Sequence, residues 1–311
     1  MTQRSIYLQR SCPGCGQSPS PRADVSTEVR AEDLGLEDLV PHWNGFFKDK
    51  VFFSYTKCAC CGLEYAPVFF TPEQLERLYG QMPANMSEVP LEVLRGTQRG
   101  YFEALKQAGT LNGGFIEVGP DIGLFTENCV REGGFDNYWL FEPNRDVAPV
   151  LEGVMSGKRF QIIHDMFGFS HVPDRSINAA VMIHVLDHLL DPIATLKELR
   201  QKLLPGAQLL IVTHDESSLL RKLFGAKWPA FCLQHPQIYN PATITTVLNA
   251  AGYDVVRQEK TVNHFQISFL LKHLLWALGF RVKSVPSFWN ITVGLRLGNM
   301  LTLATPTNSR S

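Results

Sequence analysis

The sequence predicts an α/β protein built on an open, mostly parallel sheet, with a small cysteine-rich module before it. Three observations predict this architecture. Short apolar runs alternate with helical segments through the middle of the chain, as expected of parallel strands joined by crossover helices. One of these runs, Phe115 to Val118, ends at a glycine turn. Two Cys-x-x-Cys motifs stand nearer the N-terminus.

The composition is that of a globular protein without a strong charge bias. The chain has 311 residues, which suggests one large domain or two smaller ones. Its formal net charge of −1 gives no global field that would favour nucleic acid or anionic lipid. No uninterrupted apolar run reaches about 18 residues, so the sequence predicts no membrane-spanning helix. Met1 to Arg10 lacks the apolar core of a secretory signal, and we expect a cytoplasmic protein.

The paired cysteines predict a zinc site. Cys12 and Cys15 form one Cys-x-x-Cys-Gly motif, and Cys58 and Cys61 form the other. Each such turn directs two thiolates at one ion, so two turns complete the tetrahedral shell of a structural zinc ion. Cys60 is an alternative ligand, although the spacing favours the other pair. The total of seven cysteines is odd, which argues for metal in a reducing compartment over a disulfide framework.

A strand, a glycine turn and a helix form the centre of the sequence. Gly119 and Gly123 bracket a turn in which the backbone bends sharply or admits a ligand closely. A helix beginning near Ile122 directs its free N–H groups at that turn. The next apolar run, Tyr138 to Phe141, ends at Glu142. An acid at the tip of the second strand of such a unit can accept hydrogen bonds from a ribose diol.

This segment resembles motif I of the class I S-adenosylmethionine-dependent methyltransferases, which has an acid two residues before its first glycine. Glu117 occupies that acid position. The resemblance implies that Gly119 and Gly123 line the methionine part of the cofactor and that Glu142 holds the ribose hydroxyls. Asp121 stands where the family usually has its middle glycine. Because Asp tolerates unusual backbone angles, we expect the turn to form, with an added carboxylate beside the cofactor.

A second stretch extends the resemblance. The segments His184 to Pro192 and Leu203 to Ile211 are similar to a string common in methyltransferases, with Asp187 and Ala207 as mild departures. The resemblance then covers roughly residues 95–260 and implies a Rossmann-like, seven-stranded methyltransferase sheet after a zinc ribbon. The expected strands are 51–55 and 63–70 in the ribbon, and 115–118, 138–142, 160–163, 179–183, 208–212, 253–258 and one beginning at 296 in the sheet. The expected helices are 71–79, 91–108, 143–155, 192–204, 219–227, 241–249 and 265–278.

The expected domain boundaries follow from these elements. They are 1–70 for the zinc ribbon, 71–95 for a linker helix and loop, 96–260 for the methyltransferase domain and 261–311 for a C-terminal helix and the last strand. The helix at 265–278 is amphipathic. It either packs on the sheet or forms an acyl-facing wall or the face of a homodimer.

Polar side chains follow several strands at the edge where open α/β sheets bind ligands. A histidine is suited to take a hydroxyl proton near neutral pH. We rank His235 first as the base, then His184 and His214. Tyr239 matches a polar position of the family. The resemblance also implies that Asp165 contacts the adenine amino group and makes Arg99 and Tyr101 candidate contacts of the cofactor carboxylate. In the other interpretation, which we favour for these two residues, they are a surface arginine and a core tyrosine. We also assign His184 to the cofactor site.

A divalent metal at this edge is a further possibility. The segment from His184 to His188 is similar to the E-V-x-E-H segment that binds a divalent ion in ubiquinone-pathway O-methyltransferases, with His184 in place of Glu. Such an ion would lower the pKa of a bound hydroxyl. In the other interpretation, Asp187 and His188 cap and pin the loop that follows, as in family members that bind no metal.

The sequence therefore predicts an S-adenosylmethionine-dependent methyltransferase that acts on a small molecule, as an O-methyltransferase of a sugar or secondary-metabolite hydroxyl. One rival is a sugar C-methyltransferase that uses His235 and Tyr239 as base and enolate stabiliser. Another is a non-catalytic binding protein on a degenerate methyltransferase fold, which Asp121 keeps open. The neutral charge and the lack of a basic, aromatic-laced strip disfavour RNA methylation.

Overall fold

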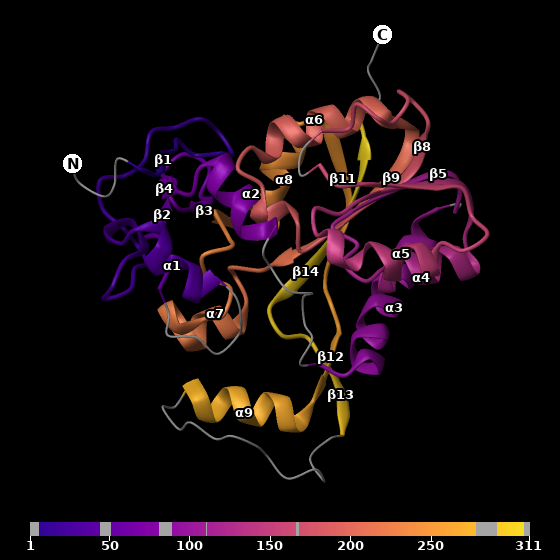
Figure 1. Cartoon of the computed structure of the whole chain (residues 1–311). Helices are drawn as coiled ribbons and strands as arrows, with labels where there is room; N and C mark the ends of the chain where they lie inside the picture. Colours follow the sequence, from indigo (N-terminus) through magenta and orange to yellow (C-terminus); the bar gives the residue numbers. More distant parts are fainter. Residues whose placement is uncertain are drawn as a thin grey trace.

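The centre of the protein is a seven-stranded sheet with the strand order β11-β14-β9-β8-β5-β6-β7. A computed structural model describes residues 6–43, 51–80, 89–109, 111–165, 168–277 and 291–307 (Figure 1). The strands are β5 (Asn112–Val118), β6 (Gly134–Phe141), β7 (Phe160–Ile163), β8 (Ile177–Ile183), β9 (Leu203–His214), β11 (Tyr253–Lys260) and β14 (Asn299–Pro306). Strand β14 is antiparallel to both neighbours, and β5 to β9 pair in parallel. This confirms the predicted seven-stranded methyltransferase sheet.

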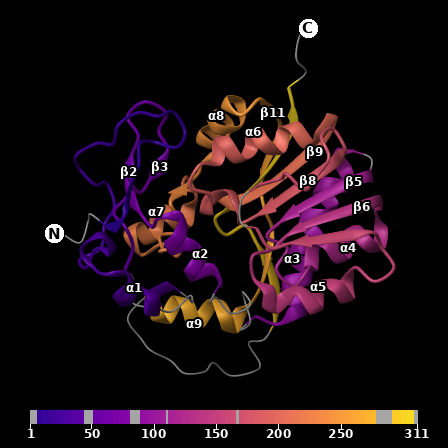
Figure 2. The same cartoon turned by 45° about the horizontal axis from the view of Figure 1, so that its top comes forward.

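Helices cover both faces of this sheet (Figure 2). One face carries α3 (Leu91–Ala108), α4 (Leu124–Glu132) and α5 (Ala148–Val154), and the other carries α6 (Pro192–Lys202) and α8 (Pro241–Ala250). Neighbouring residues of one strand pack in cores on opposite faces of the sheet, because side chains along a strand alternate between the two faces. Phe115 packs in the core with α3 and α4, whereas Ile116 packs in the core with α6 and α8.

Local capping residues explain why α6 and α8 begin where they do. The Asp191 carboxylate accepts a hydrogen bond from Ala194 N–H at 3.0 Å, and Pro192 occupies the first helical position. Asn240 forms a capping box with Thr243 at the start of α8. A side chain that binds the free N–H groups of a first turn stabilises a helix by about 1 kcal/mol. Both predicted helix starts are confirmed.

Several predicted boundaries were wrong. Strand β9 begins at Leu203 rather than at 208, because Leu203 already pairs with Ile177. Strand β14 begins at Asn299 rather than at Arg296. The predicted helix at 143–155 is a 3-10 turn, η3 (Arg145–Val147), followed by α5.

The N-terminal module consists of short elements around an aromatic core. They are β1 (Leu8–Gln9), η2 (Ala31–Asp33), α1 (Leu36–Trp43), β2 (Thr56–Lys57), β3 (Glu64–Tyr65), β4 (Val68–Phe69) and α2 (Pro72–Gly80). The expected strand at 51–55 was wrong: Phe52 and Phe53 are buried in the core of the module, and only Tyr55 forms an isolated bridge, with Val25. Strand β10 (Gln237–Ile238) pairs with β3, so the module shares a small sheet with the main domain.

The remaining elements follow the sheet or extend from it. They are η4 (Leu186–His188), α7 (Leu219–Phe224), η5 (Gly225–Lys227), β12 (Asn263–Gln266), α9 (Ile267–Ala277) and β13 (Thr292–Leu295). The β12–β13 hairpin was not predicted, and helix α9 begins after Phe265, which belongs to β12. Most of the loop expected at 80–90, and the expected helix end at 278, lie outside the described residues. Within the described part of the chain, no helix has the length and apolarity needed to cross a bilayer.

Candidate cofactor and catalytic site

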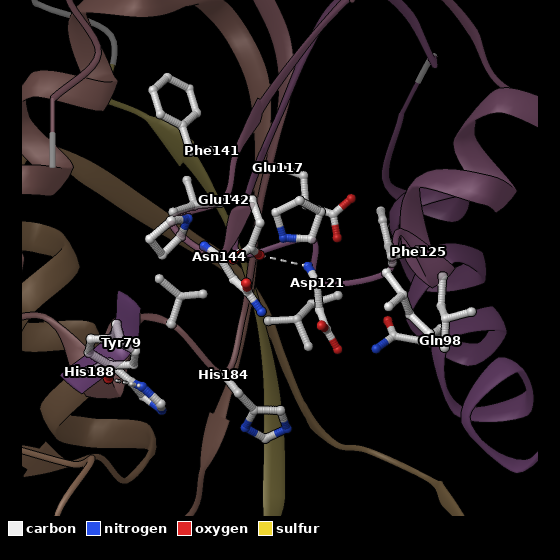
Figure 3. Close-up of a pocket in the computed structure, with 18 of the residues that line it drawn as sticks. Tyr79, Gln98, Glu117, Asp121, Phe125, Phe141, Glu142, Asn144, His184 and His188 are labelled. Carbon is white, nitrogen blue, oxygen red and sulfur yellow. Dashed lines mark hydrogen bonds between the residues drawn. The ribbon is translucent and has the colours of Figure 1, made fainter. Parts of the chain in front are cut away.

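A cavity of about 260 Å³ lies where β5, β6 and β8 end (Figure 3). It is at the carboxyl edge of the parallel strands, where open α/β sheets bind ligands. The lining includes six of the residues predicted for the cofactor: Glu117, Gly119, Asp121, Glu142, Asp165 and His184. It also includes Tyr79, Gln98, Asn144 and His188, which were not predicted for the cofactor.

The glycine turn requires its glycines. Gly119 has φ 69° and Gly123 has φ 78°, both in the left-handed region that side chains disfavour. A Cβ atom on Gly119 would lie 2.8 Å from Val185 Cγ2, which is too close for two carbon atoms. Asp121 adopts φ 51°, so the aspartate takes the backbone conformation that the family's middle glycine would have. The predicted turn is therefore present.

Glu142 is held at the cavity by two backbone N–H groups. Its buried carboxylate accepts hydrogen bonds from Asp121 N–H and Asn144 N–H, each at 2.9 Å. Burial raises the pKa of Glu142, and these two hydrogen bonds oppose the rise. Each carboxylate oxygen has a second lone pair for a ligand hydroxyl. The pair of contacts fixes the acid beside the glycine turn, as a ribose-binding residue requires.

Glu117 links β5, which precedes the turn, to α4, which follows it. The Thr126 hydroxyl of α4 donates a hydrogen bond to its carboxyl group, and both side chains are buried. Burial raises the pKa of Glu117 to about 8, an effect that outweighs the hydrogen bond from Thr126. Glu117 is therefore protonated at neutral pH. This keeps a second negative charge away from Glu142.

Two predicted cofactor residues do not line the cavity. Gly123 shapes the turn without lining it. Arg99 instead pairs with Glu103 of its own helix and with Glu132 of α4. The cavity-facing residues of α3 are Leu94 and Gln98, four positions apart on one face of the helix. That spacing was visible in the sequence and identifies Gln98 as the cavity residue missed beside Arg99.

Four histidines form a row of imidazole rings behind the cavity. His184 directly follows β8, His188 lies in η4, His214 ends β9 and His235 lies in the loop before β10. The ring centroids are 4.8 Å apart for His184 and His214, and 4.7 Å apart for His214 and His235 and for His235 and His188. The sequence predicted three of these residues as candidate bases. His188 was considered only for the metal and loop interpretations.

Only His184 and His188 of this row line the cavity. His235, His214 and Tyr239 lie behind them. The side chain of Tyr239 is fully buried, and its hydroxyl donates a weak hydrogen bond to Leu186 O at 3.4 Å. The predicted candidates are thus brought together, but the first-ranked base is one ring away from the cavity.

The row has one carboxylate, Asp187. Its Oδ2 accepts a hydrogen bond from His214 Nδ1 at 2.7 Å, and its side chain is fully buried. Burial opposes ionisation, but the hydrogen bond from His214 and the neighbouring imidazoles outweigh it, so the pKa of Asp187 lies well below its usual range. The ionised Asp187 therefore fixes the tautomer and orientation of His214.

The pKa values of the buried histidines differ between the cavity wall and the position behind it. Burial lowers the pKa of His184 and of His188 to about 3. For His235 the same burial is outweighed by Cys232 and Asp187, which raise its pKa to about 9. His235 Nδ1 donates to Ala230 O at 2.6 Å. At neutral pH the two cavity residues are neutral, and His235 is the member of the row that binds a proton.

Tyr79 is a cavity residue that comes from the N-terminal module. Tyr79 lies near the C-terminus of α2, and its hydroxyl lies 2.7 Å from His188 Nδ1 (Figure 3). The sequence placed this tyrosine in a helix but gave it no functional role. No pattern within α2 could have shown it, because the contact depends on how the module packs on the main domain.

The four predicted zinc ligands are together in the module. The Sγ atoms of Cys12, Cys15, Cys58 and Cys61 all lie within 4.8 Å of one another. Cys12 and Cys61, like Cys15 and Cys58, have Sγ atoms 3.5 Å apart. A zinc ion with bonds of about 2.3 Å places its sulfurs about 3.8 Å apart in a tetrahedron, so the group fits zinc. The exposed Cys60 is outside this group.

Comparison with known proteins gives the family. The profile of a methyltransferase domain family matches residues 93–258, which is more than half of the chain. The chain belongs to this methyltransferase domain family. It is a methyltransferase, and S-adenosylmethionine follows from the family as the methyl donor. A search of the curated proteins found no match.

Two solved structures are similar to this chain at low sequence identity. A putative methyltransferase from Haloferax volcanii, in complex with the Trm112 methyltransferase activator, has a TM-score of 0.50 and 14% identity over 70% of this chain and 94% of that chain. A S-adenosylmethionine-dependent methyltransferase from Leishmania major has a TM-score of 0.49 and 14% identity over 93% and 99% of the two chains. At 14% identity, the similarity to the Haloferax volcanii protein shows the fold alone.

Proposed function

We propose that this protein transfers the methyl group of S-adenosylmethionine to a hydroxyl of a small molecule, such as a sugar or a secondary metabolite. The observation that carries this proposal is that one cavity is lined by Glu142 and the Gly119 turn and also by His184 and His188. The residues suited to the cofactor and the candidate bases therefore share one site. We also propose that zinc occupies the four-cysteine group.

The cofactor supplies a methyl group on a positively charged sulfur. The residues of this chain then have two tasks, which are to align the acceptor oxygen and to remove its proton. The O–H bond breaks, the oxygen bonds to the methyl carbon, and the carbon–sulfur bond breaks to leave S-adenosylhomocysteine. No redox partner is needed.

The histidine row offers one neutral base at the cavity. His188 lines the cavity, and burial lowers its pKa to about 3, so its imidazole is neutral at neutral pH and can take the proton of the acceptor. The ring of His235 lies 4.7 Å behind it, and its pKa of about 9 means that it already holds a proton at neutral pH. We therefore assign the role of base to His188 in place of His235, which the sequence ranks first.

Calorimetry with S-adenosylhomocysteine tests the cofactor part of the proposal. Glu142→Gln keeps the size of the side chain but removes its charge. A hydrogen bond to a charged group contributes about 1.5–3 kcal/mol, so we expect binding about 10- to 100-fold weaker. Glu152→Gln is the matched control, because Glu152 is exposed on α5 and does not line the cavity. A folded protein that binds no S-adenosylhomocysteine would instead support a non-catalytic binding protein.

Transfer of a deuterated methyl group tests the acceptor class. The protein is incubated with CD3-labelled S-adenosylmethionine and a panel of sugars and hydroxylated metabolites, and products are identified by mass spectrometry and NMR. A label on oxygen supports the proposal. A label on carbon, with solvent deuterium exchange at the same carbon, would establish C-methylation in its place.

A further inference from the structure

We propose that His184, Asp187 and His214 form a binding site for one divalent transition-metal ion beside the cofactor cavity. Each residue offers one ligand atom, and these atoms all lie within 4.8 Å of one another. The ligands come from three places, the end of β8, η4 and the end of β9, so only the folded sheet brings them together. His184 also lines the cavity, and an ion on it would be within reach of a bound acceptor.

Two buried atoms at this position have no hydrogen-bond partner. They are His184 Nδ1 and Asp187 Oδ1. The Asp187 side chain is fully buried, and a buried carboxylate oxygen without a partner costs about 1–3 kcal/mol or more. The two atoms belong to two of the three proposed ligands. A cation between them would satisfy both.

The backbone and the neighbouring side chains orient the ligands. His184 has φ 52°, in the left-handed region that a histidine disfavours, so its direction is maintained against local strain. Its Nε2 lies 3.4 Å from Asn299 Nδ2, so a side chain near the start of β14 also contacts the ring.

The ligand set selects the class of ion. Two imidazoles and one carboxylate suit a first-row transition ion such as manganese, iron, cobalt, nickel or zinc, whereas magnesium prefers oxygen ligands and water. Bonds of about 2.0–2.2 Å would draw the three ligand atoms somewhat closer than they are now.

The third ligand is His214 rather than His188. The family resemblance of the sequence pointed to His184, Asp187 and His188. In the structure His188 Nδ1 lies 2.7 Å from the Tyr79 hydroxyl, and His188 is outside the ligand group. His188 stays available to take the proton of the acceptor.

The catalytic use of the ion rests on the proposed hydroxyl methylation. A cation bound to the acceptor oxygen lowers the pKa of that hydroxyl and orients it toward the methyl donor. His188 then receives the proton, so the ion and the proton transfer involve different histidines. The binding of the ion, in contrast, can be tested without any acceptor.

Cobalt spectroscopy tests the site on the full-length protein with zinc in its cysteines. Co²⁺ is added by equilibrium dialysis. We expect one Co²⁺ per chain and weak visible ligand-field bands without a thiolate-to-cobalt charge-transfer band. That charge-transfer band would show that cobalt had entered the cysteine group instead. Asp187→Asn and His214→Gln should each weaken cobalt binding at least tenfold, which is about 1.4 kcal/mol.

Two controls make the result decisive. His188→Gln should bind cobalt like the wild type, and so should His171→Gln on the exposed surface. Circular dichroism shows whether each variant is folded, and calorimetry with S-adenosylhomocysteine is measured separately. The proposal is overturned if the wild type shows no such bands, or if His188→Gln loses cobalt while His214→Gln keeps it. Cobalt bound without S-adenosylhomocysteine binding would leave the metal site standing and remove only the proposed function.

Discussion

Replacing Arg10 by methionine should loosen the cavity loop, although Arg10 lies in the N-terminal module. The guanidinium is buried and donates to Ala66 O, Pro236 O and Leu190 O at 3.2, 3.0 and 2.9 Å. It also donates to Gln237 Oε1 at 2.8 Å. Gln237 Nε2 in turn donates to Leu186 O and Leu189 O at 3.2 and 2.7 Å. The η4 loop is therefore tied to the module through two side chains.

The structure gives the size of the effect. Methionine fills much of the space but removes the donor of Ala66 O, Leu190 O and Gln237 Oε1, at about 1–3 kcal/mol each. Pro236 O still accepts a hydrogen bond from Ala66 N–H at 2.9 Å. Part of this loss is offset because the guanidinium no longer has to be buried, and burial already lowers the pKa of Arg10 to about 10. We expect a net loss of about 3 kcal/mol. If the loop opens locally, its amides should exchange about 100-fold faster.

Hydrogen exchange followed by mass spectrometry measures this change. The expected gain is confined to peptides that cover 184–192, while peptides from α5 keep their protection. Arg30→Met is the matched control, because Arg30 belongs to the same module but forms an exposed ion pair with Asp33. Unchanged exchange of the loop in a folded Arg10→Met protein would refute the coupling.

Three further changes test other parts of the site. Gly119→Ala should weaken S-adenosylhomocysteine binding at least tenfold in calorimetry, because its Cβ would be too close to Val185. A variant with wild-type affinity would show that the cofactor does not depend on the conformation of this turn. Chelation of the cysteine-bound metal should raise exchange across 184–192, reversibly with Zn²⁺, and a loop that stays protected would argue against coupling. Native Glu117 holds its proton between pH 4.5 and about 8 while the unfolded chain releases it, so the wild-type free energy of unfolding should fall over this range. In Glu117→Gln this fall, measured by urea titration, should be smaller. Equal pH dependence of the free energy of unfolding in both proteins would contradict the raised pKa.

The sequence predicted the sheet because its signal is local. Apolar runs, capping residues such as Asp191 and Asn240, and the glycine turn all lie within a few positions of the element they define. The cysteine group was predictable for the same reason, since each Cys-x-x-Cys turn forms its own half of the site. The strand expected at 51–55 failed because burial of Phe52 and Phe53 requires only packing, and their backbone pairs with no neighbouring strand.

Residues whose role depends on packing between distant segments could not be predicted in this way. Tyr79 reaches His188 across 109 positions of the chain, and Arg10 reaches Gln237 across 227. The choice between His188 and His214 as partner of Asp187 is of the same kind. His188 is the neighbour in sequence, but the pairing of β8 with β9 brings His214 to the carboxylate.

The histidine row is supported from two sides, and this division matches the two tasks proposed for it. His184 directly follows β8 and His214 ends β9, and Asp187 and Asn299 contact them from the main domain. His188 and His235 are supported by tyrosines of the N-terminal module. The Tyr79 hydroxyl bonds to the ring of His188, and the Tyr55 hydroxyl donates to the carbonyl of His235. The sheet thus positions the proposed metal ligands, whereas the cysteine-rich module positions the proposed base, His188. A module that served only as an attached binding unit would not need to contact either histidine.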